Sequence, residues 1–176
     1  MKRGLLKVRS KELGNDIAAL WMWMYKETGL KMKKIFECEA KVENLDKATA
    51  FVEAELEELG CGMKQMMELT VALEEIFVNV AHYAYSKTGA DGKQIPDTGT
   101  GPMTITADAK DGVFYLIFED QGIAYNPLEK PDPDITLSAE ERDIGGLGIY
   151  MVKKSMDDVI YERKDGKNIL TLVKKL

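Results

Sequence analysis

The sequence lacks several features that would place it in a common functional class. It has only two cysteines, Cys38 and Cys61, and a single histidine, His82, so neither a zinc-ligand cluster nor a disulfide framework is expected. It also lacks an excess of positive charge, because 24 Lys and Arg residues stand against 30 Asp and Glu residues, for a net charge of −6. Direct nucleic-acid binding is therefore not expected, since it depends on Lys and Arg residues clustered on one surface. A reducing, cytoplasmic location fits this composition.

No apolar run is long enough to span a membrane. The longest near the start, residues 17–25, has nine residues where about 20 are needed, and no small-residue cleavage site follows it. Its Trp and Met content favours an N-terminal helical extension, residues 1–31, that packs on the main domain or on another chain. An interfacial membrane helix has a similar composition. Trp21 and Trp23 also predict a docking surface that could mediate homodimerisation.

The remaining residues, 32–176, are expected to form one α+β domain. Hydrophobic patterning predicts helices and strands whose order favours a two-layer sandwich, with a mostly antiparallel sheet covered by helices on one face. An exposed loop is expected over residues 86–102. The predicted strands are residues 35–42, 103–107, 113–119, 158–163 and 168–173, and the predicted helices are residues 45–59, capped by Asn44, residues 64–85, and a short helix ending near residue 155.

Residues 121–143 show no regular pattern, and three prolines interrupt them. A long irregular segment inside a small domain is usually functional. We therefore expect a lid or binding loop here.

Polar side chains occur on the long, apolar predicted helix. Glu75 and Asn79 are four residues apart, so they share one helix face. Such a pair is often only solvated, but an Asn carbonyl is a hard ligand suited to Mg²⁺, and a Glu one turn away is a candidate base. His82 is expected to be a structural residue near the pocket rim.

Two further stretches can border a ligand. The strand ending in Phe118-Glu119-Asp120 is followed by Gln121-Gly122, which places a carboxylate at the mouth of a core strand. Gly145, Gly146 and Gly148 precede the short helix, where free backbone N–H groups and the helix dipole favour an anion. The P-loop string is absent, so a phosphate site needs another design.

Taken in order, Glu75-x-x-x-Asn79, Asp120-x-Gly122, the lid and Gly145-Gly146-Leu147-Gly148 resemble the GHKL ATPase superfamily with its Bergerat ATP-binding fold. That resemblance implies that Asp120 accepts a hydrogen bond from the adenine amino group and Gly122 allows the base to approach. It also implies that Asn79 holds Mg²⁺ and that the three glycines border the triphosphate. Thr171, on the last strand, is carried over as an adenine-side contact.

Within the superfamily, residues 71–85 and the end of the chain are similar to the anti-sigma factor serine/threonine kinases of the RsbW type. The resemblance covers about residues 33–176. Arg142, beside the glycines, is expected to meet a phosphate or a partner. One departure is Ala124, which stands where the family often has a second glycine and could reshape the pocket.

The resemblance implies a Mg·ATP-dependent kinase that phosphorylates Ser or Thr on an anti-anti-sigma (STAS-type) protein, with Glu75 as the catalytic residue and a sigma factor as a possible second partner. Two alternatives stay open. One is a nucleotide-dependent binding module that sequesters a sigma factor or another regulator with little or no kinase activity. The other is a catalytic domain whose partner is a phosphatase or a receiver-linked protein.

Overall fold

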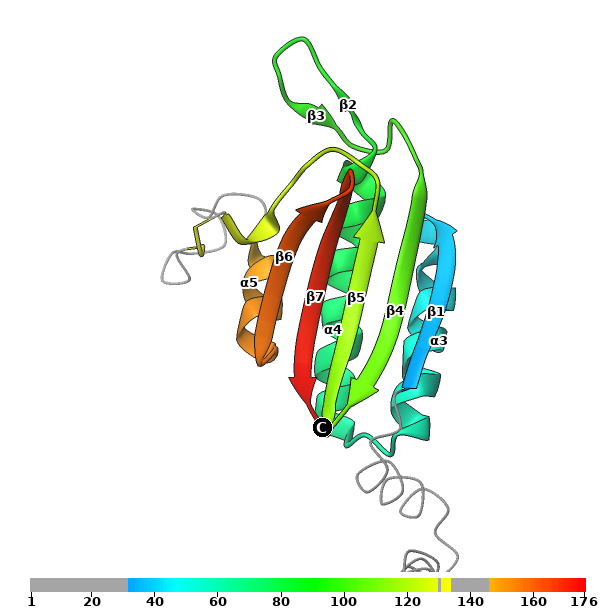
Figure 1. Ribbon diagram of the computed structural model, residues 1–176. Helices are drawn as coiled ribbons and strands as arrows, with labels where there is room; N and C mark the ends of the chain where they lie inside the picture. Colours follow the sequence, from blue (N-terminus) through cyan, green and yellow to red (C-terminus); the bar gives the residue numbers. More distant parts are fainter. Residues whose placement is uncertain (1–31, 130, 134–145) are drawn as a thin grey trace, which may run out of the picture.

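The computed structural model describes residues 32–129, 131–133 and 146–176 (Figure 1). The expected N-terminal extension, residues 1–31, lies outside the described residues. So does the part of the expected lid from residue 134 onward, with Arg142 and Gly145. The cysteines Cys38 and Cys61 are both free thiols. Among the described residues, no helix is long and apolar enough to cross a membrane.

A five-stranded antiparallel sheet forms one layer of the fold, in the order β1-β4-β5-β7-β6. This confirms the predicted α+β class with a mostly antiparallel sheet. Each strand after β1 extends a little beyond its predicted range, and tight turns with Asp111-Gly112 and Asp165-Gly166 join two of the strand pairs. The strands are β1 (Met32–Glu39), β4 (Pro102–Lys110), β5 (Val113–Asp120), β6 (Asp158–Lys164) and β7 (Lys167–Lys175).

Three helices, α3 (Leu45–Glu58), α4 (Met63–Asn79) and α5 (Leu147–Ser155), cover one face of this sheet (Figure 1). Alternate residues of the central strands point toward them, because successive side chains of a strand face opposite sides. The core between the layers includes Phe77, Leu73, Phe114, Leu116 and Leu172, all at most 1% exposed. None of the described residues forms a helix on the other face of the sheet.

The predicted helix of residues 64–85 is in fact two segments. Its α-helical part ends at Asn79, and a π-helix, Val80–Ala84, continues it. A π-helix admits an extra residue per turn and is frequent at functional sites. Periodicity does not reveal this change, and its effect is to alter the direction of side chains just beyond Asn79.

Shorter elements complete the described chain. Asn44 takes the N-cap position of α3, as expected, but its side chain makes no capping bond and instead donates to the Glu39 carbonyl at 3.0 Å. The region expected to be an exposed loop contains a small hairpin that projects beyond the sheet (Figure 1). These shorter elements are η1 (Val42–Asn44), β2 (Lys87–Thr88), β3 (Gln94–Ile95) and η3 (Pro127–Glu129).

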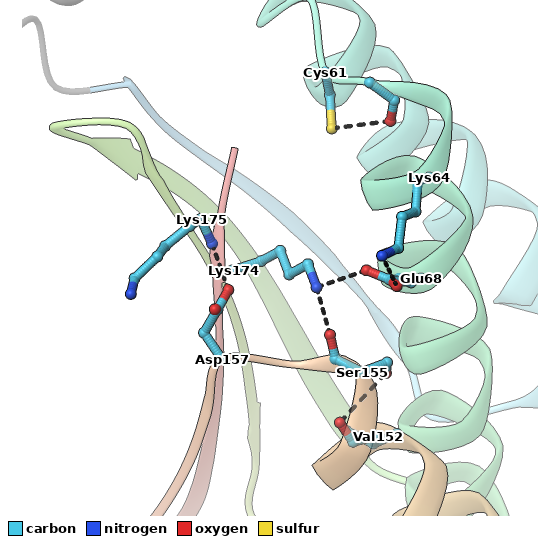
Figure 2. A network of polar contacts seen from close by, with 9 residues as sticks. Cys61, Lys64, Glu68, Val152, Ser155, Asp157, Lys174 and Lys175 are labelled. Carbon is cyan, nitrogen blue, oxygen red and sulfur yellow. Dashed lines mark hydrogen bonds and ion pairs between the residues drawn. The ribbon is translucent and has the colours of Figure 1, made fainter.

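A partly buried lysine ties α4, α5 and β7 together (Figure 2). Lys174 Nζ on β7 lies 2.6 Å from Glu68 Oε2 of α4 and donates to the Ser155 carbonyl at 2.5 Å. Ser155 ends α5, where a positive charge is favourable for the helix dipole. This contact fixes α5 against α4, and therefore fixes the start of α5 beside the end of α4.

Candidate nucleotide site

A cavity of about 440 Å³ opens between the end of α4, the start of α5 and the ends of β5 and β7. This volume lies within the usual range for small-molecule sites. The cavity brings together residues that are far apart in the sequence, and among its lining residues are Glu75, Asn79, Asp120, Gly146, Gly148, Lys153, Tyr161 and Asn168. Five of these eight were predicted from the sequence.

Asp120 ends β5 with its side chain on the helix-covered face, where the residue is only 7% exposed. One oxygen, Oδ1, accepts hydrogen bonds from the Gly122 backbone N–H and from Asn168 Nδ2, both at 2.8 Å. No described residue donates to Oδ2, the second oxygen. The carboxylate therefore has a fixed orientation and one acceptor available to a ligand.

Asn168 on β7 connects the groups around Asp120. Its Nδ2 also donates to the Ile123 carbonyl at 2.9 Å, and its Oδ1 accepts from Tyr161 Oη at 2.9 Å and from Arg163 Nη1 at 2.8 Å. Arg163 Nη1 donates as well to the Gly122 carbonyl, at 3.0 Å. Asn168 thus holds both the carboxylate and the loop that follows it.

Burial raises the pKa of Asp120 above its ordinary value, because desolvation disfavours the charged form. The hydrogen bonds from Asn168 and Gly122, and then the charge of Arg163, act in the opposite direction. Tyr85 faces the same carboxyl group. The pKa of its phenol is also raised, mainly because the side chain is partly buried. A ligand that needs an ionised acceptor will therefore be lost from the site as the pH falls through the raised pKa of Asp120.

Asn168→Ala is expected to shift the loss of ligand binding at low pH to a higher pH. The substitution removes a donor that stabilises the ionised carboxylate, so the pKa of Asp120 rises further while Arg163 and Gly122 still face it. Measuring ATP affinity against pH for both proteins checks this, with thermal unfolding followed in parallel. An unchanged pH midpoint in a folded variant would show that Asn168 does not position Asp120.

Glu75 and Asn79 share one face at the end of α4, as their spacing predicted. Asn79 Nδ2 donates to the Glu75 carbonyl at 2.7 Å, which fixes the amide and leaves Oδ1 as the atom that can bind a cation. Both residues line the cavity. The structure thus brings the predicted metal ligand and the predicted base to the same wall.

Gly148, in the first turn of α5, makes room for the Glu75 side chain. A Cβ atom added at residue 148 would lie 1.9 Å from Glu75 Oε2 and 2.6 Å from its Cδ. Gly146, at the N-cap, has a φ of 100°, a left-handed conformation that glycine adopts without strain. Glycine is thus needed at the two positions for different reasons: for backbone conformation at Gly146 and for space beside the Glu75 side chain at Gly148.

Gly148→Ala is expected to displace the Glu75 carboxylate, because the added methyl group overlaps it. Under the kinase function that the resemblance implies, with Glu75 as its base, phosphoryl transfer is expected to fall by about 10-fold or more and ATP affinity to change much less, since a small misplacement of a catalytic group is costly. Rates and affinities measured on the same protein separate the two effects. Equal losses of both would mean that residue 148 matters for binding and not for Glu75.

Gly122 also has a structural role that the sequence did not predict. A Cβ atom there would lie 2.1 Å from the Ala84 carbonyl oxygen, so glycine lets the loop pack against the π-helix, and Ile123 N–H donates to that same carbonyl at 2.8 Å. Ala124 is exposed, and positive φ at a non-glycine residue occurs, among the described residues, only at Asp97, Asp111 and Asp165. Alanine at position 124 is therefore accommodated without backbone strain.

Thr171 is a correction to the expected site. The buried residues of β7 alternate with it, so Thr171 faces the side of the sheet opposite the described helices and does not line the cavity. Asn168, three residues before Thr171 and on the helix-covered side, is the β7 residue that reaches Asp120. Register explains the error, because adjacent strand residues face opposite sides. Arg142 and Gly145 lie outside the described residues.

Sequence reasoning did not single out Asn168, Tyr161 or Lys153. Lys153 of α5 pairs with Asp132 and both line the cavity. Asn168 follows a Gly-Lys turn and gave no local signal, because its role depends on the pairing of β7 with β5. His82, expected near the rim, places Nδ1 2.5 Å from Asp97 Oδ1.

The comparison with protein families decides the classification. The model of the histidine kinase-like ATPase domain matches residues 38–174, most of the chain. The chain belongs to this family. The GHKL assignment from the sequence is therefore confirmed.

Curated relatives of this family member include anti-sigma factors. It is 24% identical over 136 residues to the anti-sigma F factor of Geobacillus kaustophilus, a match covering 77% of this chain and 86% of that protein. The anti-sigma F factor of Clostridium acetobutylicum is also 24% identical, over 77% of this chain and 87% of that protein. The serine/threonine-protein kinase BtrW of Bordetella bronchiseptica is 36% identical over 57 residues, 32% of this chain and 40% of that protein.

A solved structure shows the same fold. The chain matches the RsbU and RsbW domains of Rv1364c from Mycobacterium tuberculosis with a TM-score of 0.54 and 14% sequence identity, over 82% of this chain and 32% of that one. Together with the relatives above, this confirms the resemblance to the RsbW-type anti-sigma factors.

The cavity is chemically suited to ATP and Mg²⁺. Asp120 is only 7% exposed and its Oδ2 has no described donor, so this oxygen is an acceptor that suits an exocyclic amino group. The described residues contain no cluster of three carboxylate, His or Cys side chains that could hold a metal ion alone. Mg²⁺ keeps several waters and takes most of its ligands from substrate phosphates, with only one or two side chains from the protein. Asn79 Oδ1 is the cavity oxygen that the resemblance assigns to this role.

Proposed function

We propose that this protein is an anti-sigma regulatory factor that binds Mg·ATP and phosphorylates Ser or Thr on an anti-anti-sigma (STAS-type) antagonist. The observation that carries the proposal is the convergence of Asp120, Asn79 and Glu75 on one cavity. Membership of the ATPase family and the similarity to anti-sigma F factors support it. A sigma factor is the second partner that these relatives' names suggest, and a cytoplasmic location fits both partners.

Each residue has a separate task in the proposed site. Asp120 accepts a hydrogen bond from the adenine amino group and so orients the base. Asn79 supplies an oxygen ligand for Mg²⁺, which neutralises charge on the phosphates when bound. Gly146 and Gly148 allow the phosphates to approach the start of α5. Lys153, whose partner is Asp132, adds a positive charge at the same wall.

Glu75 is the proposed catalytic base. It accepts the proton of the partner's hydroxyl group while a bond forms between that oxygen and the γ-phosphorus and the bond to ADP breaks. Orientation and electrostatic stabilisation supply most of the rate in phosphoryl transfer. The position of Glu75 is therefore as important as its basicity, and Gly148 and the Lys174 contact both help to set it.

The metal part of the proposal is tested with Asn79→Ala. We expect wild type and variant to bind ATP equally in the presence of EDTA, whereas only wild type binds more tightly when Mg²⁺ is added, by about 10-fold or more. Thermal unfolding midpoints report this, because a ligand of the folded state raises stability by mass action. A variant that retains the full Mg²⁺ effect would remove Asn79 from the metal site.

A further inference from the structure

The face of the sheet that none of the described helices covers carries a continuous row of β-branched residues, three isoleucines and two threonines. Strand register places five residues side by side across all five strands, and each is β-branched. The members of this row, which we call the central row, are Ile35, Thr106, Ile117, Thr171 and Ile160. Tyr115, Ile169 and Val173 flank it on the same face.

The two ends of the central row are exposed. Ile35 on the edge strand β1 is 54% exposed and Ile160 on the opposite edge strand β6 is 49% exposed. Isolated apolar residues are normal on a protein surface, but a row that runs from one edge to the other marks an interaction site. The described helices all lie on the other face (Figure 1).

The chain has an apolar segment of its own that is close enough in sequence to β1 to reach this face. Residues 17–25 read Ile-Ala-Ala-Leu-Trp-Met-Trp-Met-Tyr, and residues 26–31 connect them to Met32, the first residue of β1. Six linking residues reach about 20 Å when extended. Four inter-strand spacings also amount to about 19 Å, so the segment can cross the sheet from the β1 edge.

The charges that flank residues 17–25 also favour contact between this segment and the open face. The sequence preceding the apolar segment is basic at Lys2, Arg3, Lys7, Arg9 and Lys11 and has no acidic residue before Glu12. The rows beside the central row on the open face are acidic on balance, with Glu37, Glu119 and Glu162 on one side and Asp108, Asp158 and a single base, Lys33, on the other. Glu119 already has an ion-pair partner, Lys167, at 3.2 Å. An apolar segment with a basic flank therefore matches a row of isoleucines and threonines whose borders are acidic on balance.

We propose that residues 17–25 pack across the central row of their own chain and cover the open face of the sheet. A tether of six residues keeps the segment at a high effective concentration, which favours its own domain over a second copy. The inference is independent of the nucleotide site, which lies on the helix-covered face. In this arrangement the segment protects an apolar sheet face from other chains.

Intrinsic fluorescence tests this proposal in the full chain, because Trp21 and Trp23 are the only tryptophans. We expect blue-shifted emission, shielded from acrylamide and independent of protein concentration. Ile160→Lys is expected to shift the emission to the red and to raise quenching several-fold, and Ile35→Lys provides a second variant at the other edge. Met63→Lys, at a 75% exposed position on α4, is the control and should change neither property.

Three outcomes would overturn the proposal. Red-shifted, readily quenched tryptophans in wild type would show that the segment is not packed. Unchanged emission in folded Ile160→Lys and Ile35→Lys, or a change only in Met63→Lys, would place the segment elsewhere. Emission that shifts with concentration in step with a doubling of the mass in light scattering would identify a second copy as the occupant.

Discussion

Asp120→Asn is expected to weaken ATP binding by at least about 100-fold without unfolding the protein. The donors Gly122 N–H and Asn168 Nδ2 both point at Oδ1, so the new amide must place its oxygen there. Its NH₂ group then replaces Oδ2 and faces the amino group of adenine, donor against donor. A buried polar group left unpaired in this way is strongly disfavoured. Calorimetric titration of both proteins with Mg·ATP measures the effect.

The same substitution should change the preferred base. Guanine presents an acceptor where adenine presents an amino donor, so Asp120→Asn is expected to bind GTP better, relative to ATP, than wild type does. Glu119→Gln is the matched control, because Glu119 is the preceding residue of β5, faces the opposite side and pairs with Lys167 at 3.2 Å. Unaltered ATP affinity in Asp120→Asn would exclude this carboxylate as the contact to the base.

Glu75→Gln is expected to lower the rate of phosphoryl transfer by about 100-fold or more and to leave ATP affinity within a few-fold of wild type. A glutamine preserves the shape of the side chain beside Gly148 but cannot accept the proton of the attacking hydroxyl group, a contribution of this order in general base catalysis. The assay uses radiolabelled γ-phosphate and the STAS-type proteins of the source organism, each purified and tested singly.

Glu74→Gln is the control for this prediction, because Glu74 is adjacent in sequence but is exposed and does not line the cavity. Equal transfer by wild type and Glu75→Gln would remove Glu75 from the chemistry. Tight ATP binding with no transfer to any STAS-type protein would instead support the alternative function, a nucleotide-dependent binding module.

The sequence predicted those parts of the fold that depend on local pattern. The apolar run beginning at residue 113 placed β5 correctly, and the i,i+4 spacing placed Glu75 and Asn79 on one wall. The π-helix was missed because its side chains keep a nearly helical spacing, so the break at Val80 leaves no clear periodicity signal.

The parts that depend on strand register were less accessible from the sequence. Thr171 was placed at the site by its motif, yet β7 pairs so that Asn168 faces Asp120 and Thr171 faces the open side. The exact neighbour of a residue in a sheet is set by tertiary pairing across many residues of chain, and a shift by one position reverses the face. The contact of Asn168 with Asp120 follows only from the pairing of β7 with β5.

The site also depends on contacts remote from it. Lys174, at the other end of β7, bonds to the last carbonyl of α5 and pairs with Glu68 of α4. Because α5 is short, this contact sets where its first turn lies and thus how closely Gly148 approaches Glu75. Sequence motifs identify the residues of the wall, and these remote contacts bring them to the correct separation.

Isothermal titration calorimetry of the wild-type chain with ATP in the presence of Mg²⁺ tests the central claim most directly. We predict saturable binding at one site per chain, which is abolished by Asp120→Asn and weakened by Asn79→Ala. Absence of saturable binding at millimolar ATP, in protein shown by circular dichroism to be folded, would contradict the assignment of this cavity as a nucleotide site.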